Sequence, residues 1–110
     1  MDIASARAMA FETFAGDEYD HFGRPAYRIP PKKAGGRPGR TFMTLWIEEG
    51  HAVLMLDVEA QTGLVARYPK AFRPHPSKWG QQGATIAELV LMGEQTFRDA
   101  LALAHAHAAR

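Results

Sequence analysis

The residues best able to do chemistry in this sequence are its cations, which gather in two clusters without carboxylates. Ten of the thirteen Lys and Arg residues belong to these clusters: Arg24, Arg28, Lys32, Lys33, Arg37 and Arg40, then Arg67, Lys70, Arg73 and Lys78. The formal net charge is only +1. A polyanion responds to the local field rather than to net charge, so the placement of these cations favours a nucleic-acid partner. The alternative is that both clusters are ordinary solvated loops.

The first cluster lies on a segment with the composition of an exposed hairpin. His21–Arg40 contains six cations, four prolines, four glycines and no carboxylate. Arginines beside glycine suit a narrow minor groove or phosphates, whereas lysines suit phosphates. We therefore expect Arg37, Arg40, Lys32 and Lys33 to anchor one side of a nucleic acid. About five such contacts would make log affinity fall against log salt with a slope of roughly −4 to −5.

The second cluster is predicted to form the other side of the same surface. Both sides and the strand between them would then contact DNA, through Arg67, Arg73 and Lys78 on the second side and Arg24 and Arg28 in the middle. In the alternative, these side chains are merely solvated and Trp79, which follows Lys78, fills the core.

Two aromatic side chains complete the predicted surface. If the aliphatic residues of the strand Thr41–Ile47 face the helices, Phe42 and Trp46 project from the opposite face of the sheet. Aromatic rings beside arginines on an open sheet could stack bases or bind phosphate. Exposed aromatic residues equally mark a dimer interface or pack under a loop, so both alternatives stay open.

Patterns for catalysis and metal binding are absent. There is no cysteine, and neither of the two serines lies in a nucleophile elbow. Asp20 and His21 are adjacent on a predicted strand and therefore point to opposite faces. His105 and His107 stand two residues apart on a predicted helix, about 200° around its axis, so they cannot grip one ion. We expect no enzyme, no cofactor and no metal.

Hydrophobic periodicity and turn residues predict three helices and five strands. Helices are expected over 2–14, 57–68 with Asp57 as N-cap, and 93–110; strands are expected over 19–29, 41–47, 52–56, 71–74 and 79–90. The last helix should bury one face, formed by Phe97, Ala100, Leu101, Ala104 and Ala108. The strand 52–56, nearly all apolar, should be central, and 71–74 should lie at an edge.

This element order predicts a single α+β domain over residues 1–110. Short hairpins between consecutive strands give an antiparallel sheet, and the helices can cover one face of it as a two-layer sandwich with the order α-β-β-β-α-β-β-α. The sequence contains no apolar run long enough to span a membrane and no signal-peptide core. Together with the lack of cysteine, this favours a cytoplasmic protein.

The chain resembles the MmcQ/YjbR-like family. The resemblance rests on GRPAYRI, FMTLW and VLMLD on the first three predicted strands, then on ARYPKAF, RPHPSKWG and the C-terminal helix, and it covers almost the whole chain. It implies the frataxin-like CyaY fold in its double-wing DNA-binding form, without enzyme activity or cofactor. The tip PPKKAGGRPGR is longer and more basic than the family pattern. Iron delivery, which frataxins support with an acidic first helix, is not expected, because this one carries only Asp2 and Glu12.

The sequence therefore predicts a DNA-binding domain that acts mainly through phosphates with little sequence preference. The alternative is a protein-interaction module, or a homodimerising domain, that uses the sheet face carrying Phe42 and Trp46.

Overall fold

The computed structural model describes residues 1–110 and contains one open sheet of six antiparallel strands. The spatial order is β1-β2-β3-β4-β6-β5. The strands are β1 (Asp17–His21), β2 (Arg24–Arg28), β3 (Thr41–Trp46), β4 (His51–Met55), β5 (Phe72–Pro74) and β6 (Ala84–Glu88). The prediction of β4 as a central strand and β5 as an edge strand is confirmed.

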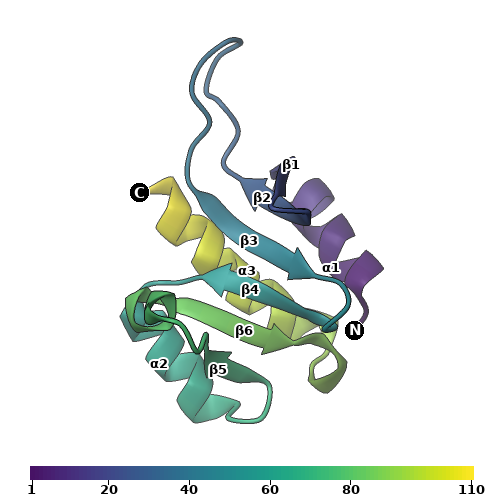
Figure 1. Cartoon of the computed structure of the whole chain (residues 1–110), viewed down its shortest axis with the longest axis vertical. Coiled ribbons are helices and arrows are strands. Elements are labelled where there is room, and N and C mark those ends of the chain that lie inside the picture. Colours follow the sequence, from purple (N-terminus) through teal and green to yellow (C-terminus); the bar gives the residue numbers. More distant parts are fainter.

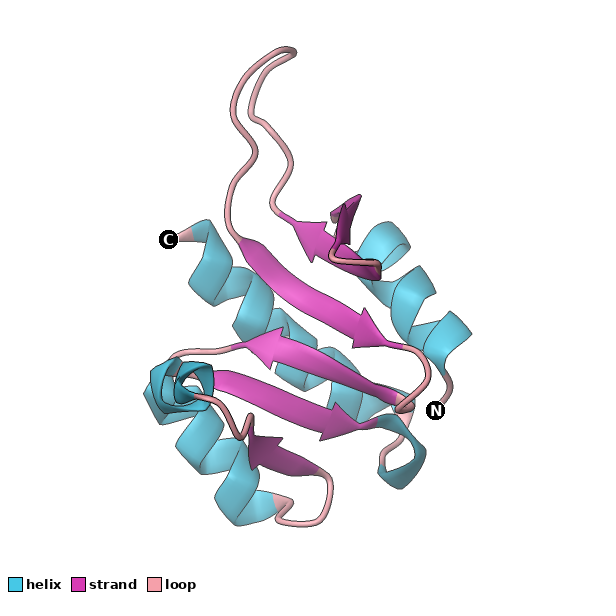
Figure 2. Cartoon of the chain, in the orientation of Figure 1, coloured by secondary structure: helices cyan, strands magenta, loops and turns pink.

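Three helices lie on one face of the sheet (Figures 1 and 2). They are α1 (Ile3–Ala8), which continues as a π-helical turn over Met9–Thr13, α2 (Val58–Arg67) and α3 (Glu94–Ala109). The Asp57 carboxylate accepts a hydrogen bond of 2.7 Å from the Ala60 amide and caps α2 as predicted. On α3 the buried face is the predicted one, with Phe97 and Leu101 fully enclosed. The α+β class with an antiparallel sheet is therefore established.

The predicted strand 19–29 is wrong, because the chain reverses in its middle. β1 and β2 form a hairpin in which His21 pairs with Arg24 across a two-residue turn. Both turn residues have positive φ, 53° at Phe22 and 85° at Gly23, which is the requirement of a type I′ turn. The order is therefore α-β-β-β-β-α-β-β-α, with one strand more than predicted. The reversal also puts Arg24 on the same face as Tyr19 and His21.

The predicted strand 79–90 is much shorter than expected. Only Ala84–Glu88 is extended, between 3₁₀ turns at Lys78–Gln82 and Leu89–Leu91. Two glycines explain the turn before β6. A Cβ on Gly80 would lie 1.9 Å from the His75 carbonyl oxygen, and one on Gly83, which has φ 112°, would lie 1.8 Å from that of Leu56. These close approaches hold the segment against His75, which follows β5, and against the end of β4, so the strand does not extend into it.

The main core lies between the sheet and the helices, and Phe42 is part of it. Phe42 is fully buried, so its predicted exposure is wrong. The cause is a bulge between β2 and β3. Tyr27 pairs with Met43 but Arg28 pairs with Thr41, which leaves Phe42 as an extra residue. Phe42 and Met43 therefore both join the core, and Thr41 lines the opposite face with Trp46.

Candidate nucleic-acid interface

The loop between β2 and β3 forms a hairpin that projects from one end of the molecule (Figure 1). We call Pro30–Arg40 the basic arm. Its base is closed by hydrogen bonds from the Ile29 amide to the Arg40 carbonyl (3.0 Å) and from the Gly39 amide to the Ile29 carbonyl (2.7 Å). Its tip is a turn in which Gly35 has φ 75° and the Gly36 amide donates to the Lys33 carbonyl. Because of this projection the molecule measures 41 Å along its long axis and 26 Å across.

Three of the four predicted cations of the arm are free for a ligand. Lys32, Lys33 and Arg37 are exposed, and none forms an ion pair. Arg40 is engaged elsewhere, because its Nη2 donates to the carbonyl oxygens of His107 (2.7 Å) and Arg110 (3.0 Å). A cation there satisfies carbonyl groups at the C-terminus of α3 and complements the helix dipole. The available charge of the arm therefore comes from its tip.

Two further predicted cations are neutralised by carboxylates. Arg28 Nε donates to Asp17 Oδ2 at 2.8 Å, and its guanidinium stacks 4.3 Å from the centroid of the Tyr19 ring. Arg73 Nη2 lies 2.8 Å from Glu88 Oε1 on the neighbouring strand. Both partners face these arginines across strand pairs of the sheet. Arg28 and Arg73 therefore contribute little local positive field.

The structure does not bring the two basic clusters onto one surface. The second cluster lies around the C-terminal end of α2, β5 and the 3₁₀ turn Lys78–Gln82, whereas the basic arm projects from the opposite end of the long axis (Figure 1). Arg67 and Lys78 are exposed, and Arg67 lies 5.2 Å from the Tyr68 ring. The prediction that both basic clusters form one surface is therefore wrong, and the basic arm is separate from the second cluster.

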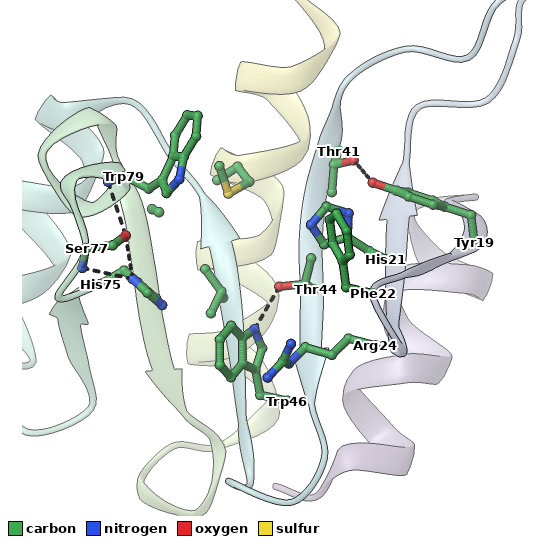
Figure 3. Close-up of a pocket in the computed structure, with 13 residues that line it drawn as sticks. Tyr19, His21, Phe22, Arg24, Thr41, Thr44, Trp46, His75, Ser77 and Trp79 are labelled. Carbon is green, nitrogen blue, oxygen red and sulfur yellow. Dashed lines mark hydrogen bonds between the residues drawn. The ribbon is translucent and has the colours of Figure 1, made fainter.

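Between these ends, the face of the sheet opposite α1, α2 and α3, which we call the open face, is hollowed. A cavity of about 550 Å³ opens there, with 13 lining residues and no carboxylate among them (Figure 3). Trp46 lies in its floor, where the indole Nε1 donates to Thr44 Oγ1 at 3.1 Å. The guanidinium of Arg24 lies 3.6 Å from the centroid of this indole ring. Thr41, the first residue after the basic arm, also lines the cavity, so the arm joins the sheet at the edge of the cavity.

His51, next to this cavity, has a lowered pKa. The His51 ring lies 5.6 Å from that of Trp46, and its Nδ1 is 3.6 Å from Glu88 Oε1. Burial lowers the pKa of His51 below the ordinary 6.5, and Arg73 adds to this effect while Glu88 opposes it. Its buried Nε2 has no hydrogen-bond partner. His51 is therefore held in the neutral form near pH 7.

Sequence reasoning missed most of the rings around the cavity. Phe22, Tyr19, His21 and His75 were not expected to share a site, and Trp79 is 56 % exposed rather than a core residue. The available signal was Phe-Gly between two alternating runs, which is compatible with a two-residue hairpin turn.

His105, one of the two histidines near the C-terminus, packs among aromatic rings. His105 packs its ring against Phe14 and Phe42, at centroid distances of 5.5 and 5.3 Å. The chain contains no group of three or more His, Asp or Glu side chains placed to hold a metal ion.

Comparison of the chain with protein-family models, with curated proteins and with solved structures finds no match. None of the helices combines the length and the apolar character that crossing a bilayer requires.

Proposed function

We propose that this domain binds nucleic acid, mainly through backbone phosphates and with little sequence preference, and that the basic arm makes the principal contact. One observation carries the proposal: Lys32, Lys33 and Arg37 lie exposed and unpaired on a projecting hairpin that contains no carboxylate. No catalytic step belongs to this function.

The chemistry of the arm suits phosphate contacts. Lysine ammonium groups bind phosphates as point charges, and the planar Arg37 guanidinium can bind two phosphate oxygens at once. Gly35 and Gly36 at the tip have no side chains that would hold the backbone away from a ligand. Such contacts carry no base information, so the affinity should be similar for different sequences.

We also propose membership of the MmcQ/YjbR-like family with its CyaY-like fold. Support comes from the antiparallel sheet covered on one face by α1, α2 and α3, and from the family-like segments on β2, β3 and β4. The extra strand β1 and the long basic arm are features in which this chain departs from the expected pattern.

Fluorescence anisotropy with labelled duplex DNA at low salt tests the function. We compare the wild-type protein with Lys32→Gln/Lys33→Gln/Arg37→Gln and with a control, Arg67→Gln/Lys70→Gln/Lys78→Gln. Both triple variants lower the formal net charge from +1 by three, all at exposed positions. We expect micromolar binding by the wild type, strong weakening in the arm variant and little change in the control. Equal weakening in both variants would mean that only net charge matters, and no wild-type binding would refute the function.

A further inference from the structure

We infer that the cavity on the open face of the sheet stacks unpaired bases of single-stranded nucleic acid. This inference rests on the proposed function and extends it from phosphates to bases. Its basis is the set of side chains around the cavity, because six of the 13 lining residues carry rings: Tyr19, His21, Phe22, Trp46, His75 and Trp79.

Two of these rings are open to a ligand, whereas Trp46 is covered by the Arg24 guanidinium and has the His51 ring beside it. Trp79 lies on one side, and His21 and Phe22 lie on the other (Figure 3). Phe22 is 87 % exposed and Trp79 is 56 % exposed. Val53 and Met55 contribute an apolar floor between them. Stacking on aromatic side chains is how single-stranded nucleic acids bind sheets and open grooves, because every base has a π-face.

The polar groups of the cavity suit an anion. The lining contains Arg24 and no carboxylate. Arg24 forms no ion pair, although it also lines a second pocket together with Glu48 and Glu49. Its guanidinium lies over the Trp46 ring in a cation–π contact. A strand that stacks in the cavity can continue past Thr41 to the phosphate-binding cations of the basic arm.

The conformation of Phe22 points to the same role. A non-glycine residue with φ near +53° is uncommon, and for a bulky side chain this conformation is strained. Asn, Asp or Gly would fit the first position of this turn without that strain. Phe22 contacts only the edge of His21 among the aromatic rings, at a centroid distance of 4.8 Å. The strained turn therefore presents an exposed phenyl ring at the rim of the cavity.

A second copy of the chain fits this face less well than a nucleic acid. A dimer with two-fold symmetry across the cavity would bring two copies of Arg24 to the same interface, and neither lining would supply a carboxylate. A single-stranded nucleic acid supplies both the planar groups and the negative charge that the face lacks.

The test compares a labelled oligothymidylate of about 12 nucleotides, within the usual site sizes of roughly 4–16, with a duplex of the same length. The variant Phe22→Ala/Trp79→Ala removes both exposed rings. Phe11→Ala is the control, because Phe11 is also exposed (57 %) but lies in the helical layer. We expect the wild type to prefer the single strand, and the double variant to lose single-strand affinity at least fivefold while its duplex affinity and that of the control stay unchanged.

Tryptophan fluorescence gives a second readout that does not depend on whether the variant Phe22→Ala/Trp79→Ala folds. The chain has two tryptophans, so Trp79→Phe leaves Trp46 as the sole indole and Trp46→Phe leaves Trp79. We expect oligothymidylate to quench each remaining indole.

Three results would overturn the inference. If the arm variant loses affinity and Phe22→Ala/Trp79→Ala does not, phosphate binding stands and base stacking is refuted. If thymidine monophosphate binds as tightly as the oligonucleotide, the cavity is a nucleotide site. If the double variant changes only the oligomeric state in analytical ultracentrifugation, the face is a dimer interface. If the wild-type protein binds neither the oligothymidylate nor the duplex, the proposed function itself is refuted.

Discussion

The salt dependence of the proposed duplex binding should follow from the number of cations that the structure leaves free in the basic arm. Counterion release contributes about 0.9 to the slope for each phosphate contact. The basic arm offers Lys32, Lys33 and Arg37, whereas Arg28 and Arg73 are ion-paired and Arg40 caps α3. Three contacts give a slope of about −2.7, which is a loss of about 40-fold in affinity between about 50 and 200 mM salt. Five contacts would give about −4.5 and a loss of about 500-fold.

Anisotropy titrations at four or more salt concentrations measure this slope. Lys33→Gln should reduce its magnitude to about 1.8, because one phosphate contact is lost. Lys78→Gln is the matched control, since Lys78 is also exposed but lies outside the arm, and its slope should equal that of the wild type. A wild-type slope near −4.5, or an unchanged slope in Lys33→Gln, would refute the restriction of phosphate binding to the three free cations of the basic arm.

Three further predictions concern the scaffold. Gly83→Ala should destabilise the domain by more than about 3 kcal/mol in urea unfolding, because φ is 112° and the new Cβ would meet the Leu56 carbonyl. The control Gly63→Ala, which lies in open space on α2, should stabilise the domain by about 0.5–1 kcal/mol. Equal effects would contradict the close approach at Gly83. Gln61→Leu should lower the free energy of unfolding by about 1–3 kcal/mol in the same assay, because the buried Nε2 donates to Gly80 O, Ala84 O and Thr85 Oγ1. A similar loss in the exposed control Gln95→Leu would contradict this reason. The pKa of His51 is lower in the folded state than in the unfolded state, so on acidification the unfolded state protonates at a higher pH. The free energy of unfolding should therefore not depend on His51 above pH 6.5 and should fall as the pH drops below it. The loss should be smaller in His51→Gln, and parallel pH profiles would contradict this origin.

Much of the scaffold follows from local patterns in the sequence. The apolar spacing on α3 identifies the face that is buried, Asp57 marks the start of α2, and the Pro-Gly-rich basic composition identifies the exposed arm. Each depends on residues close together in the chain, where periodicity and turn chemistry are informative.

The missed features depend on pairing between distant segments. The bulge at Phe42 appears only in the register of β3 against β2, and two adjacent apolar residues do not reveal it. The ion pair of Arg73 with Glu88 forms because β5 pairs with β6. The turn at Phe22 is an exception, because it is local: it was missed since phenylalanine is a poor residue for positive φ. The aromatic cavity is the sum of such pairings, so no single motif predicts it.

The most direct test of the proposed nucleic-acid surface is amide and indole chemical-shift mapping by NMR with ¹⁵N-labelled protein and an unlabelled oligothymidylate. We predict shift changes at Lys32, Lys33 and Arg37 in the arm and at the indole groups of Trp46 and Trp79, with α2 and the exposed face of α3 unchanged. Shift changes confined to the region of Arg67–Arg73, or changes that leave both the arm and the two indoles unaffected, would contradict it.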